Sequence, residues 1–497
     1  MTQKASLSWR TWKAALDTLR KEEILVLVYF TERGKFQVFT LYGKRKKSDN
    51  VSMKRKIYEK LLEWKNTRKG RTALLIEGAR RTGKSYIVEE FAKHEYKSYI
   101  LVNFGHLAKN VKSVFHNDLS DIPMFLQKLS LVTSTRLYER DSLIIFDEVQ
   151  KYPAARESIK FLVADGRFDY IETGSLISIH ENVKDIVIPS EEEKIEMYPM
   201  DFEEFCWAMD DFTTVPYIKD CFLKGKPLGT EMHRLAMSLF RQYMVVGGMP
   251  RVVKTYAETK QFAQVEFEKK LIIDLYREDI GKKSNKNRRK VIALFDSLPS
   301  ELSRHDKVFT LAQADPNGKS INYEDAFFWL EDSMIANICF NSTEPKVGLN
   351  LNTDRTTLKC YMGDTGLLVN MAIGEKDFIE DEIYKALLFD RLHINEGMFV
   401  ENVVAQILRA NGHRLFFHSF YDSDSSKNRQ EIDFLIRDGK KIAPIEVKSS
   451  DTTQHASLDR LIKKYHQYLG KKYIVNTKDY QEKDGIIFIP LYMAICL

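Results

Sequence analysis

The stretch Gly78–Ser85 reads GARRTGKS and lies directly between the apolar run ALLIE (73–77) and the helix-like segment YIVEEFAKH (86–94). It satisfies the pattern GxxxxGK[ST] in full, in the strand-to-helix context that this pattern requires. The residues that make the match are Gly78, Gly83, Lys84 and Ser85. A plain glycine turn is the alternative, and the context disfavours it. The stretch therefore predicts a phosphate-binding loop within an α/β domain.

The chemistry of phosphate binding explains the spacing of these residues. The glycines let backbone N–H groups at a helix N-terminus surround a phosphate, Lys84 reaches the β and γ phosphates, and the Ser85 hydroxyl ligates magnesium. We therefore expect ATP and Mg²⁺ as cofactors. The predicted nucleotide-binding residues are Gly78, Ala79, Arg80, Arg81, Thr82, Gly83, Lys84, Ser85 and Tyr86.

Two later apolar runs end in polar residues that suit ATP hydrolysis. SLIIFDE (142–148) places Asp147 at the end of a buried strand, where we expect it to hold the metal, and Glu148 next to it, where it would polarise the attacking water. FDYIETGS ends with Thr173 and Ser175. We expect Ser175 to contact the γ phosphate or the water, and a simple helix N-cap is the alternative role.

The order of apolar runs and helical patterns predicts several segments. Short apolar runs alternate with helical stretches from about residue 70 to 200, which predicts a parallel sheet covered on both faces. Helical patterns then dominate to about residue 390, and the last hundred residues return to α/β. The predicted segments are a basic extension with a β-hairpin (1–52), an ATPase core (53–200), a helical lid (201–285), a small helix-rich domain (286–390) and a C-terminal α/β domain (391–497).

The stretch EIDFLIRDGKKIAPIEVKSS (431–450) places Asp433 on one strand of a predicted hairpin and Glu446 and Lys448 on the other. Two carboxylates and a lysine are the set that a magnesium nuclease needs. Asp433 and Glu446 would ligate the metal, Lys448 would orient or activate water, and Glu401 on the preceding helix would complete the metal's ligands. A charge pair between Glu446 and Lys448 that needs no metal is the alternative.

The order of six motifs resembles a family of bacterial and archaeal AAA-type ATPases that carry a C-terminal domain of unknown function. The motifs are GARRTGKS, LIIFDEVQ, ETGSLIS, EMYPMDFEEF, VVGGMPRVV and LYREDI, and the resemblance covers about residues 53–497. It implies ATP binding and a winged-helix-like segment after GGMP. Residues 171–198 contain no arginine, although many AAA proteins place an arginine finger there. Arg156 and Arg167 are nearby candidates, and the alternative is that both are exposed helix or loop arginines.

The C-terminal residues resemble the restriction-endonuclease-like, PD-(D/E)XK fold. Ile432 stands where that family usually has a proline before the aspartate. The residues at matching motif positions are Glu401, Asp433, Glu446 and Lys448. The predicted fold class is therefore α/β, with an AAA-type P-loop parallel sheet, a helical and winged-helix-like middle region and a C-terminal α/β restriction-endonuclease-like domain.

Charge and composition limit the partners. Residues 1–52 hold 11 basic and 5 acidic residues, which accounts for the whole net charge of +6, so residues 53–497 are neutral overall. This balance argues against a large nucleic-acid-binding surface on residues 53–497, and a local basic face is the alternative. No apolar run approaches the length of a membrane span and the N-terminus lacks a signal-peptide core, so we expect a cytoplasmic protein without a membrane partner.

Two functions fit these observations. The first is an ATPase that hydrolyses ATP with magnesium and couples its nucleotide state to a nuclease-like domain acting on DNA or RNA. The second is a nucleotide-dependent switch that binds a protein partner and has a catalytically inactive C-terminal fold. The sequence does not determine the oligomeric state.

Overall fold

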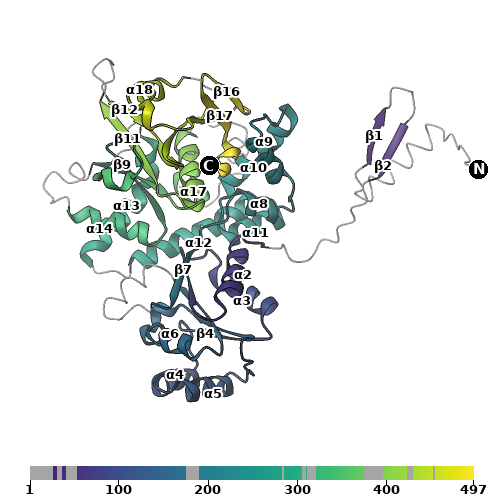
Figure 1. Cartoon of the computed structure of the whole chain (residues 1–497), viewed down its shortest axis with the longest axis vertical. Coiled ribbons are helices and arrows are strands. Elements are labelled where there is room, and N and C mark those ends of the chain that lie inside the picture. Colours follow the sequence, from purple (N-terminus) through teal and green to yellow (C-terminus); the bar gives the residue numbers. More distant parts are fainter. Residues whose placement is uncertain are drawn as a thin grey trace, which may run out of the picture. The chain divides into compact units, whose positions relative to one another are not determined.

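The computed structural model describes residues 26–30, 36–40, 53–174, 190–281, 285–304, 309–310, 321–373, 396–421, 429–450 and 454–497. The chain forms two compact units, Met1–Ser52 and Met53–Leu497, and each is described by itself. In the first unit, β1 (Val26–Phe30) pairs antiparallel with β2 (Phe36–Thr40), which confirms the predicted hairpin (Figure 1).

The second unit begins with a five-stranded parallel sheet in the order β4-β5-β6-β3-β7. Every residue of the three central strands is buried, as expected for a sheet with helices on both faces. The alternation of strands and helices that the sequence predicted is thereby confirmed. The strands are β3 (Ala73–Glu77), β4 (Ser98–Asn103), β5 (Ser142–Asp147), β6 (Asp169–Gly174) and β7 (Glu192–Glu196).

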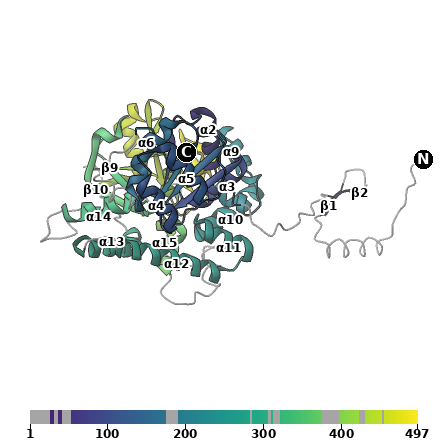
Figure 2. The same cartoon turned by 90° about the horizontal axis from the view of Figure 1, so that it is seen from below.

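Two sets of helices cover this sheet, because alternate residues of each strand point to opposite faces. Leu74 and Ile76 pack in one core with α2 and α3, whereas Ala73 and Leu75 pack in another with α4, α5 and α6. Figure 2 shows α4 and α5 side by side. The helices are α2 (Ile57–Arg68), α3 (Lys84–Glu95), α4 (Lys109–Asn117), α5 (Ile122–Val132) and α6 (Pro153–Asp165), with the short η1 (Val149–Lys151) after β5.

A helical segment follows, as the sequence predicted. Asp201 and Glu204 form a reciprocal capping box at the start of α8. The GGMP turn separates α10 from α11, and an added Cβ at Gly248 would lie 2.1 Å from the carbonyl oxygen of Met200, so only glycine fits there. The helices are α8 (Phe202–Ala208), α9 (Thr214–Leu223), α10 (Thr230–Val246), α11 (Pro250–Thr259) and α12 (Phe262–Gly281).

The next strands belong to a second five-stranded sheet, in the order β12-β11-β9-β10-β8. β9 and β10 are antiparallel, and β11 joins β9 in parallel with Phe416 opposite Phe340. Strands from both sides of the predicted boundary at residue 390 therefore share one sheet. The elements are α13 (Asn285–Ser303), β8 (Phe309–Thr310), α14 (Ile321–Asp332), β9 (Ala336–Ser342), η2 (Leu349–Asn352), β10 (Thr353–Met362), α15 (Thr365–Ile373), α17 (Glu396–Ala410), β11 (Phe416–Tyr421) and β12 (Arg429–Ile432).

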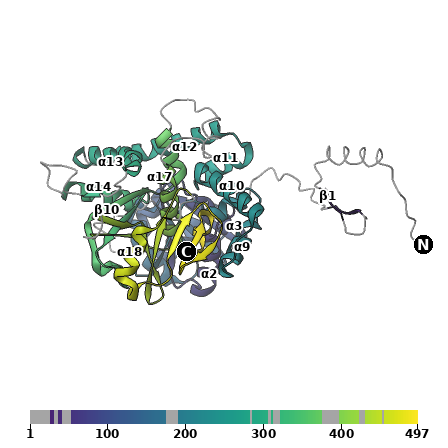
Figure 3. The ribbon, with the colours of Figure 1, turned by 90° about the horizontal axis from the view of Figure 1, so that it is seen from above.

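A third sheet, in the order β13-β14-β15-β17-β16, completes the chain (Figure 3). The sequence predicted one strand over EIDFLIRD, but the chain passes from the second sheet to the third at Asp433, between β12 and β13. The elements are β13 (Phe434–Asp438), β14 (Lys441–Val447), α18 (Ala456–Tyr465), η3 (His466–Tyr468), β15 (Tyr473–Asn476), β16 (Gln481–Lys483), β17 (Ile486–Pro490) and η4 (Leu491–Cys496).

Candidate functional site

The GARRTGKS loop joins the carboxyl end of β3 to the first turn of α3. Gly83 caps α3 with φ +93°, a left-handed conformation that glycine adopts without strain. Gly78 passes close to the chain beyond β7, because an added Cβ would lie 2.4 Å from the carbonyl oxygen of Met197. Both glycines of the motif are thus required by the backbone. The loop lies at the sheet edge where parallel α/β proteins bind ligands.

Lys84 lies across its own loop. Its Nζ donates to the carbonyl oxygens of Gly78 and Ala79, at 2.9 Å each. Burial lowers the pKa of Lys84 to about 8, while the carboxylates of Glu148 and Asp147 act in the opposite direction. The two acidic residues predicted from SLIIFDE are therefore close enough to act on this lysine.

The Asp147 side chain, at the end of β5, accepts hydrogen bonds from residues of three other elements. Its Oδ1 accepts from Ser85 Oγ at 2.7 Å and from Thr173 Oγ1, and its Oδ2 accepts from Asn103 Nδ2 at 2.7 Å. The structure thus brings Ser85 and Asp147 together, as the sequence predicted. Asn103 was missed, and its position as the last residue of the strand beside β5 was the available signal. Ser175, predicted in preference to Thr173, lies outside the described residues.

Glu148 follows β5 in a left-handed conformation, with φ +57°. Its Oε2 accepts a hydrogen bond from Gln150 Nε2 at 2.6 Å. A non-glycine residue with positive φ is uncommon and is often found at functional sites. Gln150, which holds one oxygen of the predicted general base, is a further residue that the sequence interpretation missed.

Three residues outside the motif hold the rest of the loop. Arg80 Nη1 contacts both carboxylate oxygens of Asp279 on α12, at 2.7 and 2.8 Å, and its carbonyl oxygen accepts from Tyr276 at 3.1 Å. Arg55 donates to the carbonyl oxygen of Thr82 at 2.8 Å. The Thr82 hydroxyl itself donates to Ala79 within the loop. The loop is therefore linked both to the helical segment and to the residue that precedes α2.

The other two predicted nucleotide-binding residues face solvent, since the side chains of Arg81 and Tyr86 are exposed. Arg81 has φ +69°. Both side chains are therefore accessible to a ligand at the loop.

The two candidate arginine fingers are paired within the chain. Arg156 is 1% exposed and donates to both carboxylate oxygens of Glu192 on β7, at 2.7 and 2.9 Å. The interpretation of Arg156 as an exposed helix arginine is therefore wrong, because the face of α6 that carries Arg156 packs against the sheet. Arg167 donates to Asp165, two residues away, at 2.8 Å. A buried arginine cannot reach the nucleotide of a neighbouring molecule.

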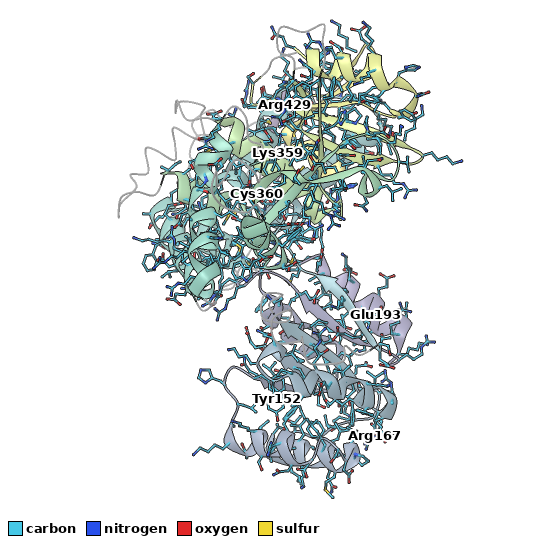
Figure 4. The ribbon with its side chains drawn as sticks, turned by 90° about the vertical axis from the view of Figure 1, so that its left-hand side faces the viewer. Tyr152, Arg167, Glu193, Lys359, Cys360 and Arg429 are labelled. Carbon is cyan, nitrogen blue, oxygen red and sulfur yellow. The ribbon has the colours of Figure 1, made fainter. Side chains whose placement is uncertain are left out.

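A second cluster of charges surrounds Lys359 on β10. Its Nζ lies 3.1 Å from Glu401 Oε1, 2.5 Å from Glu431 Oε1 and 3.6 Å from Asp433 Oδ1. The Tyr361 hydroxyl also donates to Glu401 Oε1, at 2.5 Å. Figure 4 labels Lys359 on β10 and Arg429 on β12, in the same part of the molecule. The structure therefore brings Glu401 and Asp433 together, as predicted, but around a lysine that the sequence interpretation missed.

Glu446 and Lys448 lie at the neighbouring end of β14. Lys448 Nζ is 2.6 Å from Glu446 Oε1, while the buried Glu446 Oε2 has no hydrogen-bond partner. The backbone N–H of Val447 donates to Asp433 Oδ2 at 2.8 Å, which joins the two groups. Burial, followed by the charge of Glu401, raises the pKa of Asp433 to about 7, although Lys359 acts to lower it.

Within the described parts of the chain, no three or more His, Cys, Asp or Glu side chains are arranged to hold a metal ion. The described helices also include none with the length and apolar character needed to cross a membrane.

Comparisons with known families divide the chain into three matches. Residues 70–206 match the AAA domain family, whereas residues 237–377 and 396–494 match two families described as domains of unknown function, DUF8612 and DUF4143. No curated protein matches the chain. Residues 70–206 therefore form an AAA-type domain on a parallel five-stranded sheet, and the protein is an ATPase.

Solved structures with low sequence identity are also similar to the chain. The Walker-type ATPase paby2304 of Pyrococcus abyssi is 14% identical, with a TM-score of 0.39, over 67% of this chain and 99% of that one. Cdc6p from Pyrobaculum aerophilum is 12% identical, with a TM-score of 0.24, over 70% and 97% of the two chains. A STAND protein with a tetratricopeptide repeat sensor from Pyrococcus horikoshii is 10% identical, with a TM-score of 0.24, over 69% and 47%.

Proposed function

We propose that this ATPase hydrolyses ATP with magnesium and couples its nucleotide state to a nuclease-like C-terminal domain that acts on DNA or RNA. The observation that carries the proposal is the convergence of Ser85, Thr173 and Asn103 on the Asp147 carboxylate, directly beside the phosphate loop. A hydroxyl and a carboxylate that are already in contact are the oxygen ligands that magnesium prefers.

The residues fit a bound nucleotide in the following way. Ser85 and Asp147 would hold Mg²⁺, which neutralises the charge that develops on the phosphates. Lys84 would exchange its contacts with the loop carbonyls for phosphate oxygens, while the N–H groups from Gly78 to Ser85 bind the same anion. Glu148, oriented by Gln150, would accept a proton from the attacking water. Ser175 is proposed to contact the γ phosphate or this water.

Coupling to the rest of the chain would begin at Arg80. This residue belongs to the phosphate loop, yet its guanidinium pairs with Asp279 on α12. A phosphate is a second anionic partner for the same guanidinium, and arginine suits such an exchange because it binds carboxylates and phosphates alike. Nucleotide binding would therefore change the contact between the loop and the helical lid (201–285).

The C-terminal part is proposed to have a restriction-endonuclease-like fold. Support comes from the order of its elements: a helix with Glu401, a hairpin with Asp433 on one side and Glu446 and Lys448 on the other, then the helix α18 and the parallel strand β15. The metal ligands would be Glu401, Asp433 and Glu446. Lys448 would orient or activate the water that attacks a phosphodiester.

Further parts of the proposal concern organisation and location. The order α13, β8, α14, β9 and β10, with β8 and β9 both paired to β10, supports a winged-helix-like segment within residues 286–390. We also propose that the protein acts in the cytoplasm, where ATP is available.

A nucleotide-dependent switch with a protein partner is the second candidate function. The position of Lys359 favours it, because an ammonium group already lies within 4 Å of two of the carboxylates that a nuclease would need for metal. In this case the C-terminal fold is a binding platform without catalytic activity.

The experiment that tests the proposal is the ATP turnover rate of the purified chain with magnesium, alone and with double-stranded DNA, single-stranded DNA or RNA. The Lys84→Ala variant serves as the blank. Stimulation by one nucleic acid supports the first function and identifies its partner. A rate that no nucleic acid changes favours the switch, and normal turnover by Lys84→Ala would overturn the site assignment.

A further inference from the structure

Lys359 is notable among the lysines that the structure describes because it is buried and faces several carboxylates at once. Its side chain is 1% exposed, and it lies within 4 Å of Glu401, Glu431 and Asp433. These groups come from α17, β12 and the junction between β12 and β13, whereas the lysine comes from β10. A charge taken so far out of water is stable only when opposite charges surround it.

The carboxylate oxygens around Lys359 include those proposed for a metal. Glu401 Oε1 and Asp433 Oδ1 both face the ammonium, at 3.1 and 3.6 Å. Magnesium binds oxygen at about 2.0–2.1 Å and brings two positive charges. A divalent ion on the same two oxygens would lie within a few ångströms of the ammonium, where repulsion between like charges is strong at low dielectric.

We propose that Lys359 is the resident cation of the C-terminal site: it offsets part of the negative charge of Glu401, Glu431 and Asp433 and competes with a divalent metal for their oxygens. The inference rests on the proposed role of Glu401 and Asp433 as cation ligands, and it is independent of ATP hydrolysis. The site then holds its cation permanently, and a metal enters only when the Lys359 side chain leaves.

Lys359 also links two segments that are far apart in the chain, because its strand and its carboxylate partners belong to different segments. β10 pairs with β9 and β8, and Lys359 lies opposite Cys339 in the register with β9. Its partners Glu401, Glu431 and Asp433 all lie within residues 396–494. Lys359 therefore also ties the segment matched by one family of unknown function to the segment matched by the other.

Lys448 is a matched control on the same site. Its Nζ pairs with Glu446 at 2.6 Å, but its side chain is 28% exposed, against 1% for Lys359. Removal of Lys448 leaves the contacts between Lys359 and its three carboxylates in place. The effect on metal affinity should therefore be much larger for loss of Lys359 than for loss of Lys448.

The test compares Lys359→Met and Lys448→Met with the wild-type full chain, since methionine keeps an unbranched chain without the charge. Manganese binding is measured by electron paramagnetic resonance, and melting is measured in EDTA and in Mn²⁺. We expect Lys359→Met to bind Mn²⁺ at least about tenfold more tightly than the wild type, because one nearby unit charge is removed. It should melt at a lower temperature in EDTA and regain part of this loss in Mn²⁺. Lys448→Met removes a charge that water partly screens, so it should gain less than about threefold in Mn²⁺ affinity and melt like the wild type in EDTA.

Equal Mn²⁺ affinity for Lys359→Met and the wild type would overturn the proposal. If Lys359→Met does not fold in EDTA, recovery of folding in Mn²⁺ supports it and failure to recover overturns it. Adding Asp433→Asn to Lys359→Met should abolish the gain in Mn²⁺ affinity. Magnesium-dependent ATP turnover of the same preparations reports on the ATPase site separately, so a failure there is distinguishable from a failure here.

Discussion

Lys84 and Lys359 are both held by oxygen atoms of their own chain, but the oxygens differ. Lys84 donates to two neutral backbone carbonyls of the phosphate loop, whereas Lys359 lies among three carboxylates. A neutral carbonyl binds an ammonium group weakly compared with a phosphate, so Lys84 is ready to change partners. Lys359 has no such reason to exchange its partners for an anion, because its present partners are already negatively charged.

The surroundings of the two lysines support the same contrast. Lys84 lies at the open edge of a sheet, at the start of a helix whose N–H groups also attract anions. Lys359 lies inside the second sheet, where its removal would leave the buried Glu401 without this counter-charge. The comparison indicates that a lysine beside phosphate-binding groups serves ligand exchange, whereas a lysine enclosed by carboxylates serves the fold.

The largest expected effect concerns Lys84→Ala, which should reduce ATP turnover by at least about 100-fold, as expected when a donor to the transition state is lost. Stability should change by only about 1–2 kcal/mol, because the hydrogen bonds that are lost go to neutral carbonyls. Turnover and urea unfolding of the same variant measure both quantities. A large loss of stability would contradict the contrast with Lys359, because it would show that Lys84 also stabilises the fold.

Glu148→Gln should reduce turnover by about 100-fold while ATP binds as before, because the amide cannot accept a proton from water but keeps the size of the side chain. Its oxygen can still accept from Gln150, which preserves the local geometry. Single-turnover kinetics and equilibrium binding separate the two effects. Glu157→Gln, on the exposed face of α6, is the control. Parallel losses of binding and turnover would contradict a role in proton transfer.

Glu401→Gln should destabilise the C-terminal part by about 2 kcal/mol, less than the loss of a whole buried pair because two carboxylates still face Lys359. The change also weakens the bond from the Tyr361 hydroxyl. Thermal unfolding measures the shift, with Glu482→Gln on the exposed strand β16 as the control. Equal stability of the two variants would show that Lys359 does not depend on its carboxylates.

Sequence reasoning could place the proposed ATP site because the information that specifies its loop is local. The partners of Lys84 lie five and six residues away, and a fixed pattern of glycines specifies that loop. Asp147 and Thr173 could be expected nearby, since the ends of adjacent parallel strands meet at one sheet edge. The same rule would have found Asn103 once β4 was placed beside β5.

The C-terminal cluster could be predicted only in part. Asp433, Glu446 and Lys448 share a hairpin, so their proximity follows from strand alternation. Lys359 comes from another strand and lies 42 residues from Glu401 in the chain. A lysine in the buried half of a strand gives no sign of its partners until the sheet order is known. The break of the predicted strand at Asp433 was missed for the same reason, since no residue there marks a change of sheet.

The smallest expected effect concerns the ion pair between Arg80 and Asp279, whose side chains are 33% and 14% exposed. Asp279→Asn removes a negative charge beside the phosphate loop and frees Arg80 for phosphate, so ATP should bind up to about fivefold more tightly, within the range of a partly exposed pair. Asp274→Asn, on the same helix but paired with Arg277, should leave the affinity unchanged. Titration with a fluorescent ATP analogue measures both variants. Weaker binding by Asp279→Asn would instead mean that Asp279 positions Arg80 for the nucleotide, so that the carboxylate serves the loop much as those around Lys359 serve the fold.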